Sequence, residues 1–225
     1  MVSLKSNMEL RDGEVHLWVA RRPSPVACHA SCVVRRTPPA RSREPHPPPP
    51  QSPSHKFLQE VLSQYGYHGE ITPDEKGKPR CWGGNGGNIE FNLSHTAGTT
   101  VVAVSCNPVG VDIESATRTP RRALEIARRF FTPAETAKLA ALDPIERTEQ
   151  FLRFWVRKEA MTKLDGEGIL LGASDARVLD DMHGQYRGRR VWLAEFGRDL
   201  GLVGAVAAWQ PFEIQIKDAI LLASC

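Results

Sequence analysis

Ten of the 17 prolines in this chain of 225 residues lie between Pro23 and Pro53, including an unbroken run at 47–50. Proline fixes its own backbone angle and has no amide hydrogen, so this density is incompatible with a helix or a central strand. We therefore expect residues 21–55 to be irregular and extended. The folded part of the chain must then be built from one strand before this segment and from the residues after about 56.

The same segment concentrates the positive charge. Residues 21–53 contain six arginines and the single acid Glu44, so the net charge of +3 leaves about −2 for the rest of the chain. A basic balance without interleaved aromatic residues is weak support for nucleic-acid binding. We expect no nucleic-acid partner; the alternative predicts an affinity that collapses with salt.

Apolar residues make up 41% of the chain, which is ample for a buried core. The longest apolar run, Leu200 to Trp209, has ten residues, against the ~20 that cross a bilayer. Acids occupy the amino-terminal positions where a secretory signal needs its apolar core. Five irregularly spaced cysteines do not indicate a disulfide framework. We expect a cytoplasmic protein with no membrane partner.

Alternation of apolar residues predicts several strands. They are 15–20, 89–94, 99–105, 109–114, 191–196, 202–209 and 213–217. We expect the three strands between 89 and 114 to form an antiparallel meander, and the last three strands to form a second sheet.

Helices are predicted between these strands. Apolar spacing predicts one over 57–67. Three more are indicated where Thr119, Thr132 and Asp143 each precede a proline, and Glu135 completes a capping box with Thr132. The third of these is long and should end near Gly166.

The order of these elements predicts an α+β fold with two similar halves. Each half would be a small, mainly antiparallel sheet packed with helices. We expect the halves to comprise residues 1–110 and 111–225, with any metal site in the second. Two halves within one chain favour a monomer.

Two acids on one predicted strand suggest a metal site. Asp112 and Glu114 are two residues apart, so their side chains leave the same face of the strand, opposite the apolar residues that alternate with them. Exposure to solvent is the ordinary alternative for such a pair. On the long helix, Lys158, Glu159 and Lys163 occupy adjoining parts of one surface. A Glu159–Lys163 ion pair on a charged face is the ordinary alternative there.

Taken together, the acids of the strand and of the helix favour a metal-binding site over two separate charged surfaces. Asp112, Glu114 and Glu159 would repel one another unless a hard cation lay between them, and oxygen-only ligands suit Mg²⁺. Magnesium held by few carboxylates retains positions for phosphate oxygens, so the pattern predicts a phosphorylated substrate. Ser94 and His95 end a neighbouring strand, where a histidine can hydrogen-bond a phosphate.

These residues lie in segments that resemble a known family. FNLSHT (91–96), VGVDIE (109–114) and FWVRKEAMTKLDGEGI (154–169) are similar, in order and spacing, to the three signature motifs of Sfp-type 4′-phosphopantetheinyl transferases. GKP (77–79) and RFFTPAE (129–135) also resemble family features. The resemblance covers roughly residues 56–170 closely and the rest in outline.

The resemblance implies a fold, a reaction and a site. The fold is a pseudo-twofold pair of α+β halves with coenzyme A in the cleft between them. The reaction moves the phosphopantetheine arm of coenzyme A onto a serine of an acyl or peptidyl carrier protein and releases 3′,5′-ADP. The implied Mg²⁺ ligands are Asp112, Glu114 and Glu159. The implied coenzyme A contacts are Lys78, Ser94, His95, Lys158 and Lys163.

Two of these residues are the implied catalytic groups. Glu159 is the candidate for removing the serine proton, directly or through a bound water, and Lys163 for stabilising charge on the leaving phosphate. The region from Arg121 to Phe131 is a candidate docking surface, because its arginines would attract an acidic carrier protein. An ordinary amphipathic helix is the alternative for this region.

Residues 21–55 depart from the family pattern. Relatives carry helices with basic residues after the first strand, and the prolines of this chain block such helices. The alternatives are therefore a weakened or inactive relative, and a module that binds carrier protein without catalysis.

Overall fold

The computed structural model describes residues 8–21, 52–75, 78–82, 89–166 and 172–217. Most of the segment expected to be irregular, residues 21–55, lies outside these ranges. The first elements are β1 (Glu14–Arg21), α1 (Pro53–Ser63), β2 (Glu70–Pro73), β3 (Pro79–Trp82), β4 (Glu90–Thr96), β5 (Thr99–Ser105) and β6 (Val109–Ser115). They are followed by α2 (Ala123–Phe130), α3 (Pro133–Ala140), α4 (Pro144–Lys163), η1 (Ala173–Asp175), β7 (Ala176–Val178), β8 (His183–Tyr186), β9 (Arg189–Phe196), η2 (Arg198–Leu200), β10 (Leu202–Ala208) and β11 (Glu213–Lys217). The predicted α+β class is confirmed.

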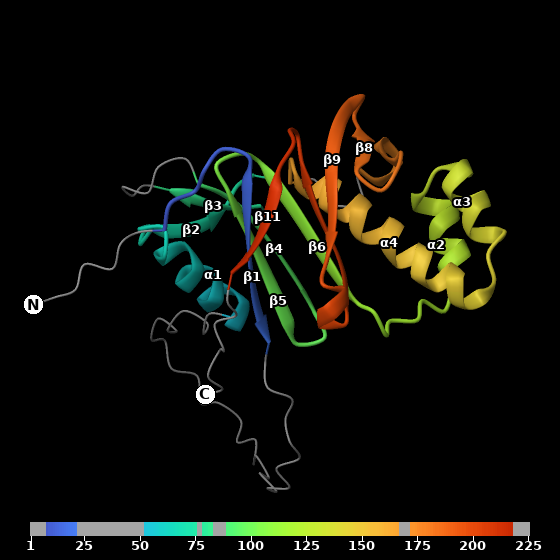
Figure 1. Cartoon of the computed structure of the whole chain (residues 1–225), viewed down its shortest axis with the longest axis horizontal. Helices are drawn as coiled ribbons and strands as arrows, with labels where there is room; N and C mark the ends of the chain where they lie inside the picture. Colours follow the sequence, from blue (N-terminus) through green and yellow to red (C-terminus); the bar gives the residue numbers. More distant parts are fainter. Residues whose placement is uncertain (1–7, 22–51, 76–77, 83–88, 167–171, 218–225) are drawn as a thin grey trace, which may run out of the picture.

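Two sheets form the centre of the molecule (Figure 1). The strand order is β11-β1-β5-β4 in the first sheet and β6-β10-β9-β8-β7 in the second, while β2 and β3 form a small separate hairpin. Apolar clusters lie between α1 and the first sheet, between the two sheets, and between the second sheet and α4. The resulting layers are helix, sheet, sheet and helix.

Strand β1 shows how alternation builds these layers. Val15, Leu17 and Val19 pack between the sheets, whereas Trp18 and Ala20 pack under α1. Successive side chains of a strand point to opposite faces, so a strand covered on both faces is apolar at nearly every position. The first sheet is therefore buried on both sides where β1 runs.

The expected meander is wrong at its third strand. β4 and β5 form the predicted hairpin, but β6 pairs with β10, with Asp112 opposite Ala205. β6 is thus the edge strand of the second sheet and lies beside β4, the edge strand of the first. Alternation indicates which residues of a strand share a face, but does not determine which strand lies beside it.

The strand at 213–217 was also expected in the wrong sheet. β11 pairs in parallel with β1, with Glu213 opposite Glu14, and completes the first sheet. Ile214 packs against the apolar cluster between the sheets, and this burial favours that position. The division into residues 1–110 and 111–225 and the pseudo-twofold relation stay predictions.

The helix starts follow their capping residues. The capping box of Thr132 and Glu135 is confirmed, and α4 begins at Pro144 with Asp143 as its N-cap. α1 begins earlier than expected because Ser52 caps it, and α2 begins only at Ala123 rather than directly after Thr119. None of the helices in the described ranges is long and apolar enough to cross a membrane.

Candidate functional site

The two faces of β6 have different surroundings. Val109, Val111 and Ile113 are buried in the apolar cluster between the sheets. Asp112 and Glu114 alternate with them and line a pocket of about 500 Å³ bordered by β4, β6 and the end of α4. Seven predicted site residues line this pocket, namely Lys78, Ser94, His95, Asp112, Glu114, Glu159 and Lys163.

A glycine allows α4 to approach β6 closely. A Cβ atom at Gly110 would overlap the carbonyl oxygen of Ala160, so only glycine permits this backbone contact. The approach brings the last turn of α4 beside Asp112. Lys163 Nζ donates to Asp112 Oδ1 at 2.8 Å and to the carbonyl oxygen of Val111 at 3.1 Å. Helix and strand are therefore joined at the pocket wall by a partly buried ion pair.

Side chains of β4 satisfy the free edge of β6. Asn92 Oδ1 accepts from the Val111 amide at 3.1 Å, and Ser94 Oγ accepts from the Ile113 amide at 3.3 Å. These amides would otherwise be unpaired at a buried strand edge, which costs free energy. The two sheets are thus connected at the pocket by side-chain rather than backbone acceptors.

The same strand holds the two acids of β6. Ser94 Oγ donates to Asp112 Oδ1 at 2.7 Å, and Thr96 Oγ1 donates to Glu114 Oε2 at 3.3 Å. The other oxygen of Glu114, Oε1, is paired with the guanidinium of Arg118. Both carboxylates therefore have fixed partners on either side.

Sequence reasoning missed Asn92, Thr96 and Arg118 as site residues. Asn92 and Thr96 each lie two residues from the predicted Ser94, so all three side chains point to one face of β4. This polar face could have indicated Asn92 and Thr96 from the sequence. For Arg118 the signal was weaker, because only its position four residues after Glu114 indicates it.

Glu159 is the acid whose electrostatics depart furthest from the ordinary range. Burial raises the pKa of Glu159 to about 7, and the negative charge of Asp112 adds to the increase. The positive charges of Lys163 and Arg118 act in the opposite direction. The effect of Asp112 on Glu159 indicates that the two carboxylates lie close together in a poorly solvated space.

The predicted metal ligands are not assembled as a set. Within the described ranges, no three His, Cys, Asp or Glu side chains meet closely enough to hold a metal ion. Asp112 is paired with Lys163 and Glu114 with Arg118, so cationic side chains occupy both acids of β6. The donor chemistry still fits, because three carboxylates on one pocket are the oxygen ligands that Mg²⁺ prefers.

Lys78 and His95 also line the pocket. Lys78 is buried, and its Nζ donates to the carbonyl oxygen of Leu164 at 3.1 Å, just after the end of α4. Burial lowers the pKa of Lys78, and the charge of Arg80 adds to the decrease. His95 is exposed at the end of β4. Each therefore places an amine or imidazole near the three acids.

Lys158 is the predicted site residue that does not reach the pocket. Its side chain is fully buried, with Nζ 3.0 Å from Glu135 Oε2 and 3.3 Å from the carbonyl oxygen of Ala173. Adjacent residues of a helix point about 100° apart, and here Glu159 faces the pocket while Lys158 faces α3. In the structure this lysine holds α3 against α4, and its predicted contact with phosphate stays a prediction.

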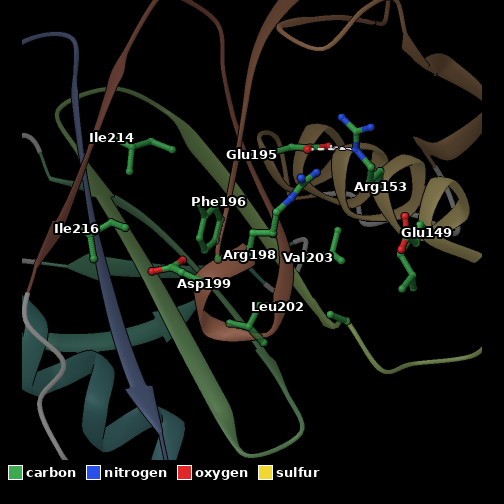
Figure 2. Close-up of a pocket in the computed structure, with 14 residues that line it drawn as sticks. Glu149, Arg153, Glu195, Phe196, Arg198, Asp199, Leu202, Val203, Ile214 and Ile216 are labelled. Carbon is green, nitrogen blue, oxygen red and sulfur yellow. Dashed lines mark hydrogen bonds and ion pairs between the residues drawn. The ribbon is translucent and has the colours of Figure 1, made fainter. Parts of the chain in front are cut away.

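A second cavity, larger than the pocket beside β6, lies in another part of the molecule. Figure 2 shows this cavity of about 720 Å³ beside the N-terminal half of α4, η2 and β11. None of the predicted site residues lines it. Arg153 and Glu195, which do line it, are paired with each other at 2.9 Å. The smaller pocket is therefore the candidate site.

Comparison with known proteins identifies the part of the chain that carries this site. The model of the 4′-phosphopantetheinyl transferase superfamily matches residues 108–205. This match covers less than half of the chain. The matched segment contains Asp112, Glu114, Glu159 and Lys163, whereas the residues before 108 that line the pocket lie outside the match.

Proteins similar to the matched segment agree with the resemblance to Sfp-type proteins. The 4′-phosphopantetheinyl transferase Sfp of Bacillus subtilis (strain 168) is 37% identical over 98 residues, 44% of this chain and 42% of the relative. The 4′-phosphopantetheinyl transferase psf-1 of Bacillus pumilus is 42% identical over 97 residues, 42% of this chain and 40% of the relative. The 4′-phosphopantetheinyl transferase HetI of Nostoc sp. (strain PCC 7120) is 33% identical over 129 residues, 54% of each chain. The matches therefore span from two fifths to just over half of these relatives' length.

Proposed function

We propose that this protein transfers the 4′-phosphopantetheine arm of coenzyme A to a serine of an acyl or peptidyl carrier protein. The observation that carries the proposal is the convergence of Asp112 and Glu114 from β6 with Glu159 and Lys163 from α4 on one pocket. The three relatives are named as 4′-phosphopantetheinyl transferases, which supports transfer of this group.

Mg²⁺ is the cation that we propose for this pocket. Asp112, Glu114 and Glu159 would hold it through carboxylate oxygens. When bound, the ion would neutralise charge on the diphosphate of coenzyme A. The acids of β6 must then exchange their present cationic partners for the ion.

Basic groups around the acids would bind the phosphates of coenzyme A. Lys163 lies beside Asp112, and Lys78 and His95 line the same pocket. Ser94 donates its single hydroxyl proton to Asp112, so we propose that it acts at the coenzyme A site by orienting this carboxylate.

The proposed reaction is a displacement at phosphorus. The serine hydroxyl oxygen of the carrier forms a bond to the β-phosphorus of coenzyme A, and the bridging P–O bond to the α-phosphate breaks. The electron pair of that bond leaves on 3′,5′-ADP, and the serine proton passes to Glu159. Lys163 would stabilise the charge that develops on the leaving phosphate.

The carrier protein would approach from the side of α2. The region from Arg121 to Phe131 presents exposed arginines, including Arg128 and Arg129 at the end of α2. A basic surface steers an acidic partner toward an adjacent site. We propose that the protein acts as a monomer in the cytoplasm, without nucleic-acid or membrane partners.

Mass spectrometry of an apo carrier protein tests the proposal. Incubation with coenzyme A and Mg²⁺ should increase the carrier mass by one phosphopantetheine, and EDTA should abolish the increase. Equal transfer with and without Mg²⁺ would contradict the metal assignment. Stable carrier binding with no mass gain would favour the weakened relative or the non-catalytic carrier-binding module instead.

A further inference from the structure

The structure assigns Arg118 a role at the cation site, as the group that occupies Glu114 until a divalent ion displaces it. Both oxygens of Glu114 have partners, Oε1 with the Arg118 guanidinium and Oε2 with Thr96 Oγ1 at 3.3 Å. A guanidinium and a divalent ion compete for the negative charge of the same carboxylate oxygen. This inference rests on the proposed function, because it concerns the same pocket.

The backbone of Arg118 is anchored while its side chain is accessible. Its amide donates to the carbonyl oxygen of Ser115 at 2.9 Å, and the Ala116 amide donates to the carbonyl oxygen of Gly201 at 3.0 Å. The turn after β6 is therefore attached to the end of η2. The Arg118 side chain is 41% exposed, against 14% for Glu114. The guanidinium can thus leave the carboxylate by changing side-chain torsions alone, without moving the strand.

Competition by Arg118 explains why no metal cluster is assembled in the described part of the chain. Arg118 is paired with Glu114, and its charge opposes the increase in the pKa of Glu159, so the guanidinium lies within electrostatic reach of both carboxylates. When an ion takes Glu114, the guanidinium is released at the rim of a pocket that would hold a diphosphate. A planar guanidinium binds phosphate oxygens in pairs, which a lysine cannot do.

Arg118 should therefore affect the ion and the diphosphate in opposite directions. Replacing it removes a competitor of the ion and also removes a phosphate donor. In Arg118→Ala the full-length protein should bind Mn²⁺ or Mg²⁺ alone about twofold to fivefold more tightly, the range expected for losing a partly exposed ion pair. In saturating Mg²⁺ the same variant should bind coenzyme A about tenfold more weakly. Arg118→Lys should recover the charge but not the paired phosphate contact.

Arg187→Ala is the matched control. Arg187 is 43% exposed and pairs with Asp165 at 3.1 Å, so it resembles Arg118 in exposure and in the type of partner. Neither Arg187 nor Asp165 lines the candidate pocket. The control should leave both affinities unchanged.

Isothermal titration calorimetry of the metal alone, and of coenzyme A with Mg²⁺, decides the matter. A metal affinity that is unchanged or reduced in Arg118→Ala would overturn the inference, even if the unaltered protein modifies carrier protein. Tighter metal binding with weaker coenzyme A binding would support it. That pair of results combined with no carrier mass gain in the unaltered protein would leave the inference standing and remove the proposed function.

Discussion

Two faces of one helix place the same kinds of residue in different surroundings. On the pocket face of α4, Glu159 and Lys163 border a cavity shared with Asp112. On the buried face of α4, Lys158 is enclosed by Glu135 and two backbone carbonyl groups. Glu135 is in turn held by the Thr132 and Val178 amides. The buried face thus satisfies each charge with fixed protein partners, whereas the pocket face leaves acids next to open space.

The difference shows that charge pairing alone does not identify a site. Lys158 and Lys163 each contact one carboxylate at short distance, and both belong to the segment that resembles a family motif. What separates them is the space around the pair, because only the pocket face has room for an ion or a phosphate. Burial without space favours a structural role.

The largest effect should come from Glu159 on the pocket face. Glu159→Gln keeps the shape and removes the negative charge, so carrier modification should fall by about 10³-fold, within the range of a lost general base. The mass-gain rate of apo carrier protein measures this change. Stability should be retained, because the variant relieves repulsion with Asp112. Glu149→Gln, an exposed position on the same helix, should keep full activity; equal rates for the two variants would refute the role of Glu159.

On the buried face, Lys158→Met should affect the fold instead. Without its cation, the buried carboxylate of Glu135 is left uncompensated, and the free energy of unfolding should fall by about 3–5 kcal/mol. Urea unfolding with an unchanged slope measures this loss. Lys138→Met, at an exposed position of α3, should change stability by less than about 0.5 kcal/mol. A stable Lys158→Met protein with weakened coenzyme A binding would instead support the predicted contact of Lys158 with phosphate.

Gly110→Ala should damage both faces together. The added methyl group would meet the Ala160 carbonyl oxygen, so α4 must move away from β6. We expect a loss of about 1–3 kcal/mol from overpacking, together with reduced carrier modification, because Lys163 would be drawn away from Asp112. Thermal unfolding and the mass-gain assay check the two effects. Normal activity with normal stability would show that the close approach is not required.

The smallest effect should be a pH dependence far from α4. Burial lowers the pKa of His16 below its ordinary value of 6.5, with the charge of Lys217 adding to the decrease and that of Glu14 opposing it. The unfolded chain therefore binds a proton more readily at mildly acidic pH. Neutral His16 therefore contributes stability at pH values above its unfolded pKa of about 6.5. This contribution is lost as the pH falls from about 6.5 toward the lower pKa of His16 in the folded protein.

His16→Gln should remove this contribution and leave metal binding unchanged. The unfolding midpoint of each protein is measured at about pH 7.5 and about pH 5.5. The decrease between the two pH values is then compared between the proteins, so that the contributions of groups that titrate in both cancel. A decline of equal size in the two proteins would contradict the assignment to His16.

Most of the elements and the composition of the pocket followed from local patterns. Alternation along β6 placed Asp112 and Glu114 on one face, and the capping residues located the starts of α3 and α4. The position at a strand end indicated His95 and the family resemblance supplied Lys78, and both residues line the pocket. Their chemical roles stay predictions until the variants are measured.

The errors concern partners that are distant in the sequence. The pattern of β6 did not specify β10 as its neighbour, nor did that of β11 specify β1. The spacing of Lys158 and Glu159 did not specify which of them faces the cavity. The sequence did not predict Arg118 as a site residue, because its pairing with Glu114 depends on the path of the turn after β6.

The sequence by itself determined which residues of each strand and helix share a face, since those periodicities depend only on neighbouring residues. Tertiary structure alone decided which faces meet. Lys163 reaches Asp112 across 51 residues of chain, and Lys78 reaches Leu164 across 86. Such contacts form only when separate elements pack, so the free energy that selects them is absent from any single segment.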